Sequence, residues 1–287
     1  MARIVGSVMT SHVPGIGGAI ARGAQGEAYW KPFFDGFGPV HRWLDEVRPD
    51  TVVVFYNDHG LNFFLDKLPT FAIGAAPLYQ NADEGWGLPT VPAFPGFPRL
   101  SWHIINSLVE DEFDVTMCQE MRVDHAFTVP MALLWPGADR RPVRTVPIAI
   151  NTVQHPLPTA ARCFKLGAAV GHAIESFDED SRVLVVGTGG MSHQLDGTRA
   201  GFINREFDLM CLEKLVSQPE ALTGYTNHQI IERAGTQGIE ILMWIAARAA
   251  LTDGVKKIHS NYHVPISNTA TGLLLLENAA AVAGCVP

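Results

Sequence analysis

Four short apolar runs constrain the fold of this chain more than any other sequence feature. Each is rich in β-branched or other apolar residues and is bounded by turn residues, as is typical of strands in a sheet that is covered on both faces. The runs are Ile4–Met9, Thr51–Tyr56, Val143–Ile150 and Arg182–Val186. Helical patterns lie between and after them, at Trp102–Glu110, Ala160–Ser176, Phe202–Leu215 and Gln237–Leu251. This alternation predicts an α/β fold: a single layered domain over residues 1–287, with a mostly buried central mixed sheet flanked by helices.

The composition supports a large buried core and excludes several classes of protein. Of the 287 residues, 47% are hydrophobic and only 17% are charged, whereas a typical soluble domain carries about 25% charged residues. Such a chain is neither disordered nor collagen-like. The formal net charge of −8 argues against nucleic-acid binding, because that requires a basic surface.

The sequence predicts a cytoplasmic protein that does not enter a membrane. The apolar runs are shorter than the roughly 20 residues that a bilayer-spanning helix needs, and the N-terminus lacks the apolar core of a signal peptide. The four cysteines are far apart and form no CxxC pair. That spacing is typical of reduced core thiols rather than of disulfides or a metal finger.

Prolines recur at every third position from Pro89 to Pro98. Because polyproline II has three residues per turn, this spacing predicts a stiff extended strap on the surface. A docking ligand for a proline-recognising partner is the alternative, and it is disfavoured because Phe94 and Phe97 interrupt the segment and favour burial.

Histidines follow three of the predicted strands. Small turn-forming residues and then a histidine come directly after the first, second and fourth runs, at His12, His59 and His193. In open α/β sheets, ligands bind at the carboxyl ends of the strands. We therefore expect these three side chains to share one edge of the sheet.

Three imidazoles at one edge raise the question of a metal, because neutral imidazole binds zinc or iron. Glu240 is the best internal carboxylate to complete such a site, since its neighbours in the sequence are apolar. A buried carboxylate is costly unless it is paired or binds a metal, but Glu240 is equally suited to complement the dipole of a helix that begins there. His125, in a further apolar stretch, lies either in the core or in a pocket.

Short motifs across nearly the whole chain occur in the same order in a known family. They are Thr10–Pro14, Asn57–His59, Asp83–Gly87, Val123–His125, Gly187–Gln194, Gly238–Glu240, Met243–Trp244 and Pro265–Ala270. The sequence Gly-Thr-Gly-Gly-Met-Ser-His-Gln at 187–194 is the most specific of them. The chain resembles the catalytic β subunits of protocatechuate 4,5-dioxygenases, within the class III extradiol ring-cleavage dioxygenases.

The resemblance implies a non-haem Fe(II) held by His12, His59 and Glu240, a two-histidine, one-carboxylate set. It assigns acid–base catalysis to His193, whose imidazole titrates near the working pH. It also implies that His125 contacts the substrate or the bound oxygen. Ser267 and Asn268 match the segment that recognises the carboxylate on the ring.

The implied reaction is 4,5-cleavage of protocatechuate with O₂, giving 4-carboxy-2-hydroxymuconate semialdehyde. Gallate or 3-O-methylgallate is the alternative substrate. A zinc hydrolase or a non-catalytic binding protein on the same fold is the alternative from a different class.

The resemblance also implies a partner chain. A small helical α subunit completes the active site in this group, so we expect an α2β2 or larger hetero-oligomer. The low charge content fits this expectation, because an interface hides apolar surface.

Overall fold

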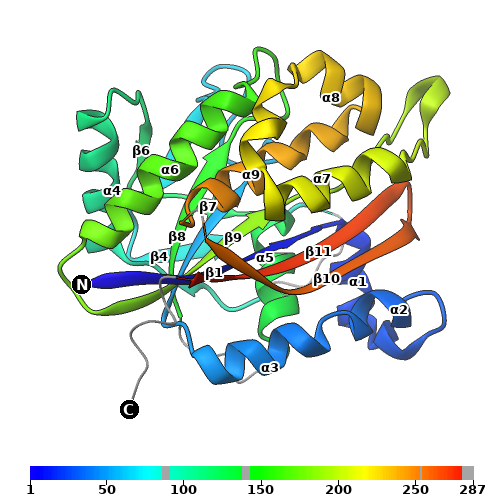
Figure 1. Ribbon diagram of the computed structural model, residues 1–287, viewed down its shortest axis with the longest axis horizontal. Coiled ribbons are helices and arrows are strands. Elements are labelled where there is room, and N and C mark those ends of the chain that lie inside the picture. Colours follow the sequence, from blue (N-terminus) through cyan, green and yellow to red (C-terminus); the bar gives the residue numbers. More distant parts are fainter. Residues whose placement is uncertain (86–90, 138–142, 253, 280–287) are drawn as a thin grey trace.

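An eight-stranded mixed sheet runs through the centre of the computed structural model, which describes residues 1–85, 91–137, 143–252 and 254–279 (Figure 1). The strand order is β10-β11-β1-β9-β2-β8-β3-β6. The bounds are β1 Ala2–Thr10, β2 Thr51–Tyr56, β3 Phe71–Gly74, β6 Thr116–Cys118, β8 Arg144–Ile150, β9 Ser181–Thr188, β10 Val255–Ile266 and β11 Thr269–Asn278. The predicted fold class, an α/β structure with a central mixed sheet flanked by helices, is confirmed.

The four predicted runs form the parallel centre of the sheet. Strands β1, β9, β2 and β8 pair with one another in parallel, and their ends lie within two residues of the predicted ones. Antiparallel pairing begins outside this group, where β11 joins β1 and β3 joins β8. The carboxyl ends of the four parallel strands therefore share one edge.

Helices cover both faces of the sheet. In β2, Val53 and Phe55 pack into one core while Val52 and Val54 pack into the other, because successive side chains of a strand point to opposite faces. Figure 1 shows α4, α6 and α9 on one side of the sheet and α3 on the other. The helices are α1 Pro14–Arg22, α2 Lys31–Asp35, α3 Gly38–Val47, α4 Pro98–Glu110, α5 His125–Leu134, α6 Ala160–Ser176, α7 Arg205–Ser217, α8 Asn227–Ala234 and α9 Ile241–Ala249.

Helix ends follow local capping chemistry. Helix α6 has its predicted bounds, and the Thr159 hydroxyl at its start accepts a hydrogen bond from the backbone N–H of Arg162. Helix α7 begins three residues later than predicted, at Arg205, because Asn204 caps it. The helix predicted at 237–251 starts as a 3₁₀ turn over Gln237–Glu240 and becomes α-helical only at Ile241.

Helices α6 and α9 pack at very short distance. A Cβ atom at Gly167 would lie 2.0 Å from the backbone oxygen of Ala246, and one at Gly171 would lie 2.4 Å from that of Ala250. Only glycine allows this approach. The contact fixes α9 beside α6, and Glu240 directly precedes α9.

The proline strap is not a uniform polyproline helix in the part that the structure describes. Pro89 lies outside the described residues, Pro95 belongs to strand β5 (Phe94–Pro95), and Pro98 is the first residue of α4. Strand β5 joins a small sheet with β4 (Leu78–Asn81) and β7 (Arg122–Val123). Phe94 and Phe97 are buried, as expected.

The long hairpin of β10 and β11 is not among the predicted strands. Its strand β11 pairs with β1, and β10 pairs with β11 on the outer side. The turn of the hairpin brings residues 267–269 close to the carboxyl ends of the parallel strands. His193 forms an isolated antiparallel bridge with Thr269. None of the helices in the described ranges combines the length and the apolar character that a membrane span requires.

Candidate active site

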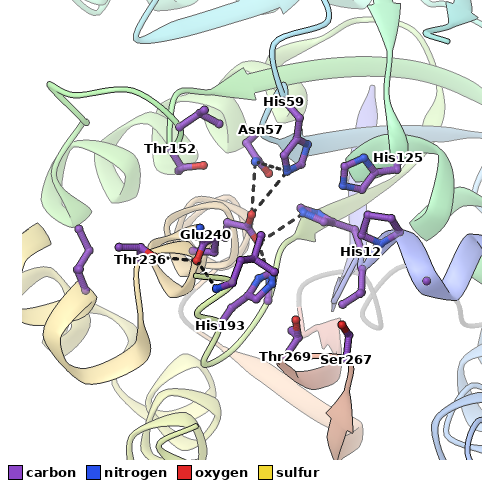
Figure 2. Close-up of a pocket in the computed structure, with 18 of the residues that line it drawn as sticks. His12, Asn57, His59, His125, Thr152, His193, Thr236, Glu240, Ser267 and Thr269 are labelled. Carbon is purple, nitrogen blue, oxygen red and sulfur yellow. Dashed lines mark hydrogen bonds and ion pairs between the residues drawn. The ribbon is translucent and has the colours of Figure 1, made fainter. Parts of the chain in front are cut away.

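A cavity of about 610 Å³ lies at the carboxyl ends of β1, β2 and β9. The histidines that follow these strands, His12, His59 and His193, all line it. They meet because β9 pairs with both β1 and β2. Glu240 and His125 line the same cavity (Figure 2), so five of the residues singled out from the sequence come together in space.

His12, His59 and Glu240 point toward one another (Figure 2). The Nε2 atom of His12 lies 3.4 Å from Oε2 of Glu240, and Nε2 of His59 lies 3.8 Å from Oε1. Glu240 is 5% exposed, and its Oε2 also accepts a hydrogen bond of 2.8 Å from the backbone N–H of Gly190. Its carboxylate therefore faces the imidazoles and forms no side-chain capping hydrogen bond with α9.

The electrostatics of this cluster favour a cation. Burial acts to raise the pKa of Glu240, but His12 and His59 outweigh it and hold this pKa well below its ordinary value. Burial acts to lower the pKa of His59, but Asp124 and Glu240 outweigh it and raise this pKa to about 10. The two carboxylates therefore stabilise positive charge on His59 or beside it, from a proton or from a metal ion.

In His12 and His59, the ring nitrogen that points away from the cavity, Nδ1, is anchored by a polar contact. Nδ1 of His59 lies 2.9 Å from Oδ2 of Asp124, which also accepts from the backbone N–H of His59 at 2.8 Å. Nδ1 of His12 lies 3.1 Å from the hydroxyl oxygen of Thr188, the last residue of β9. With Nδ1 engaged, each ring directs Nε2 into the cavity, which is how proteins orient histidine ligands of metals.

His125 is a third oriented imidazole. Its ring stacks on that of His59 with 4.1 Å between centroids, and its Nδ1 lies 2.5 Å from Oε2 of Glu84. His12, His59 and His125 each place a ligand nitrogen within 4.8 Å of the others, which is close enough for one metal ion to contact all three. The cavity thus contains two overlapping donor sets, one completed by Glu240 and one by His125.

His193 differs from the other three histidines. Its Nδ1 is buried without a hydrogen-bond partner among the described residues, and burial lowers the pKa of the ring. Its backbone is fixed instead: its N–H donates to the carbonyl of Ala234 at 2.7 Å, and its carbonyl accepts from Gln237 and Gly238. A neutral imidazole on a rigid backbone, with an unengaged ring nitrogen, is suited to proton transfer.

Comparison with known proteins identifies the family of this site. Residues 6–272 match the model of the catalytic LigB subunit of aromatic ring-opening dioxygenase. The chain belongs to this family. The family confirms the class III extradiol dioxygenase resemblance, but it does not single out the protocatechuate 4,5-dioxygenases within it.

Two curated relatives of this dioxygenase family differ in how much of their length is matched. Over 197 residues the chain is 42% identical to the gallate dioxygenase of Pseudomonas putida, a match that covers 69% of this chain and 58% of that protein. The chain therefore spans less than two thirds of gallate dioxygenase. It is 29% identical to a 2,3-dihydroxyphenylpropionate/2,3-dihydroxicinnamic acid 1,2-dioxygenase of Photorhabdus laumondii, covering 94% of this chain and 96% of that one.

A solved structure supports the fold alone. The crystal structure of an uncharacterized protein from Escherichia coli K12 matches with a TM-score of 0.59 at 14% identity, covering 94% of this chain and 99% of that one.

Of the two residues predicted to recognise the ring carboxylate, Ser267 lines the cavity and Asn268 does not. Ser267 lines the cavity and has a left-handed backbone, with φ of 56°. Its backbone N–H donates to the hydroxyl of Tyr29 at 2.8 Å. Asn268 is not among the described residues that line the cavity, so its part in substrate recognition stays a prediction.

Sequence reasoning missed several polar residues of the dioxygenase cavity. Thr152 and Thr269 line the cavity, and their hydroxyl oxygens are buried without a hydrogen-bond partner among the described residues. Asn57 donates to Oε1 of Glu240 at 3.5 Å. Thr152 follows β8 at the same sheet edge as the histidines, so the strand-end pattern was the signal that pointed to it.

Proposed function

We propose that this chain is an Fe(II)-dependent extradiol dioxygenase that opens the ring of a carboxylated catechol, with a gallate-type ring as its substrate. The observation that carries the proposal is the convergence of His12, His59 and Glu240 in one cavity. Two imidazoles and one carboxylate with open positions are the donor set of non-haem Fe(II) oxygenases. We further propose that residues 1–287 act as one catalytic domain.

The donor set of this cavity fits such an ion. Nε2 of His12, Nε2 of His59 and the Glu240 carboxylate would hold it, with Asp124 and Thr188 orienting the two rings from behind. When bound, Fe(II) would bring the catechol and O₂ together and transfer electrons between them. His125 is the alternative third ligand. We favour Glu240, because its carboxylate is buried and faces both Nε2 atoms.

The remaining histidines supply proton chemistry in this proposal. His193 accepts a proton from a ring hydroxyl and returns one as the ring opens, which its position in the cavity wall and its lowered pKa support. His125 contacts the substrate from the opposite side, beside His59. Ser267 and Asn268 are proposed to bind the ring carboxylate through neutral donors. Thr269 lines the same wall of the cavity beside Ser267.

The similarity to gallate dioxygenase favours a gallate-type ring over protocatechuate as the substrate. The match to gallate dioxygenase has the higher identity, 42% over 197 residues, whereas protocatechuate rests on motif resemblance alone. Protocatechuate remains the second candidate, and 3-O-methylgallate is a variant of the first.

We also propose that a second protein chain covers the mouth of the cavity. Val153 and Leu195 line the cavity and are 52% and 53% exposed. Apolar surface at the mouth of a cavity is of the kind that a second chain covers. The small helical α subunit and the α2β2 assembly that the motif resemblance implies would cover it.

The test is reconstitution. The chain is purified without oxygen, loaded with Fe(II) or with Zn²⁺, and mixed in air with gallate, 3-O-methylgallate or protocatechuate. We expect O₂ uptake that matches the loss of aromatic absorbance, and we expect it only in the iron-loaded protein. Turnover of gallate should be faster than turnover of protocatechuate. Activity with zinc but not iron would contradict the dioxygenase proposal, and faster turnover of protocatechuate would reverse the substrate assignment.

A further inference from the structure

Glu84 makes two contacts with one residue of the cavity. Its Oε1 accepts the backbone N–H of His125 at 2.7 Å, and its Oε2 lies 2.5 Å from Nδ1 of the same residue. The side chain of Glu84 is only 6% exposed and that of His125 only 2%. Glu84 comes from the segment between β4 and β5, whereas His125 is the first residue of α5, so the contact joins two distant parts of the chain.

This pairing fixes where the proton of His125 lies. A carboxylate only accepts hydrogen bonds, so a neutral imidazole must present its proton to Glu84 from Nδ1. The other nitrogen, Nε2, then carries a lone pair. Because Nδ1 is turned toward Glu84, Nε2 is the atom of His125 that meets the other histidines in the cavity.

We propose that Glu84 is a positioning residue that holds His125 in the Nδ1–H tautomer, so that its Nε2 meets the substrate as a hydrogen-bond acceptor. The consequence for the substrate rests on the proposed function: the group that approaches His125 must donate a hydrogen bond, as a free ring hydroxyl does. The tautomer itself does not depend on that function.

Substituting Glu84 by glutamine tests this with little change in shape. The glutamine amide has one acceptor oxygen and one donor nitrogen, but Glu84 faces two donors, the backbone N–H and Nδ1–H of His125. The amide oxygen satisfies the backbone N–H, and the amide nitrogen then donates to Nδ1. His125 must therefore move its proton to Nε2, which turns the group facing the cavity from an acceptor into a donor.

The matched control is Asp83→Asn. Asp83 is the exposed carboxylate next to Glu84, and its Oδ1 accepts from the backbone N–H of Gly85. This variant removes the same charge from the same turn without touching His125.

The tautomer is read from the ¹⁵N chemical shifts of histidine-labelled protein without added metal, with the His125 signals assigned by their loss in His125→Phe. We expect Nδ1–H in the wild type and in Asp83→Asn, and Nε2–H in Glu84→Gln. An Nε2–H tautomer in the wild type would overturn the proposal, even if the variant failed to fold. An unchanged tautomer in folded Glu84→Gln would overturn it too.

Kinetics of the iron-loaded enzyme give a second readout. We expect Glu84→Gln to lower kcat/KM for gallate about tenfold, a typical effect of losing one hydrogen bond, with unchanged iron content. Asp83→Asn should match the wild type. If the wild type does not turn over gallate, the proposed function fails while the chemical shifts still test Glu84. If the variant shows the new tautomer but wild-type kinetics, the link from His125 to the substrate is wrong.

Discussion

Nε2 of His12 lies 3.4 Å from Oε2 of Glu240, although the two residues come from opposite ends of the chain. His12 follows the first strand, and Glu240 ends a 3₁₀ turn before the last helix of the described chain. Each is anchored from behind, His12 by Thr188 and Glu240 by the backbone of Gly190. Both side chains are therefore oriented by contacts within the protein.

Removing the carboxylate should abolish iron binding. In Glu240→Ala the cavity loses its only buried negative charge that faces both Nε2 atoms among the described residues. We expect substoichiometric iron after reconstitution, measured by metal analysis of the desalted protein. Glu232→Ala, which removes an exposed carboxylate on α8, should bind iron normally. Full iron content in Glu240→Ala would favour the set that His125 completes.

Loosening the anchor of His59 should weaken iron binding without abolishing it. Asp124→Asn keeps an oxygen for the backbone N–H of Ala126, which donates to Oδ1, but replaces Oδ2, the oxygen that faces the backbone N–H and Nδ1 of His59, with an amide nitrogen. Losing such a partner typically costs about 10–100-fold in metal affinity. Competition with a chelator measures the affinity. Wild-type affinity would mean that Asp124 serves only to start α5.

His193→Phe should separate catalysis from iron binding. Its ring nitrogen is not part of either donor set, so we expect normal iron content. Turnover should fall about 10²–10⁴-fold, the usual contribution of a general acid–base group, as measured by O₂ uptake. His228→Phe, at an exposed position on α8, is the control. A turnover close to that of the wild type would remove His193 from the mechanism.

Asp50 should make stability depend on pH in the acid range. Burial acts to raise its pKa, but hydrogen bonds from Ser181, the Arg182 backbone and Thr51, with the charge of Arg144, outweigh it and lower this pKa below the ordinary 3.8. A lowered pKa in the folded state stabilises the protein above pH 3.8 and loses that effect as pH falls through the folded value.

The difference in unfolding free energy between wild type and Asp50→Asn should therefore be largest near neutral pH and shrink below pH 3.8. Urea unfolding at a series of pH values measures it. A difference that stays constant with pH would show that the charge of Asp50 is not involved.

A methyl group between α6 and α9 should destabilise the fold. In Gly167→Ala the new Cβ would lie 2.0 Å from the backbone oxygen of Ala246, so the helices must separate. Such overpacking costs typically about 1–3 kcal/mol, measured by urea unfolding. Gly224→Ala, whose Cβ would meet nothing within 4 Å, is the control and should unfold like the wild type. Equal stability of the two variants would contradict the tight contact.

Part of the site could be predicted because it rests on local sequence. The strand before His12, the strand before His59 and the strand before His193 are each visible as a short apolar run with a turn after it. Parallel strands place their carboxyl ends at one edge, so three separate local patterns predict one shared location. The fold class follows from the same runs.

The hairpin of β10 and β11 was not predicted, because its sequence carries no clear local pattern. Its inner strand is apolar on both faces, and the run Leu273–Leu276 is buried, so it shows neither strand alternation nor helical spacing. Thr269, which starts this strand, was missed with it.

The sequence by itself determined the four central strands, the bounds of α6 and the histidines at the strand ends, because these depend on neighbouring residues along the chain. Only the tertiary structure decided that Glu240 faces His12 and His59, that Glu84 holds His125, and that the Thr188 hydroxyl meets His12. These pairs are distant in sequence. Their contacts depend on strand order, loop paths and helix packing, which no local pattern contains.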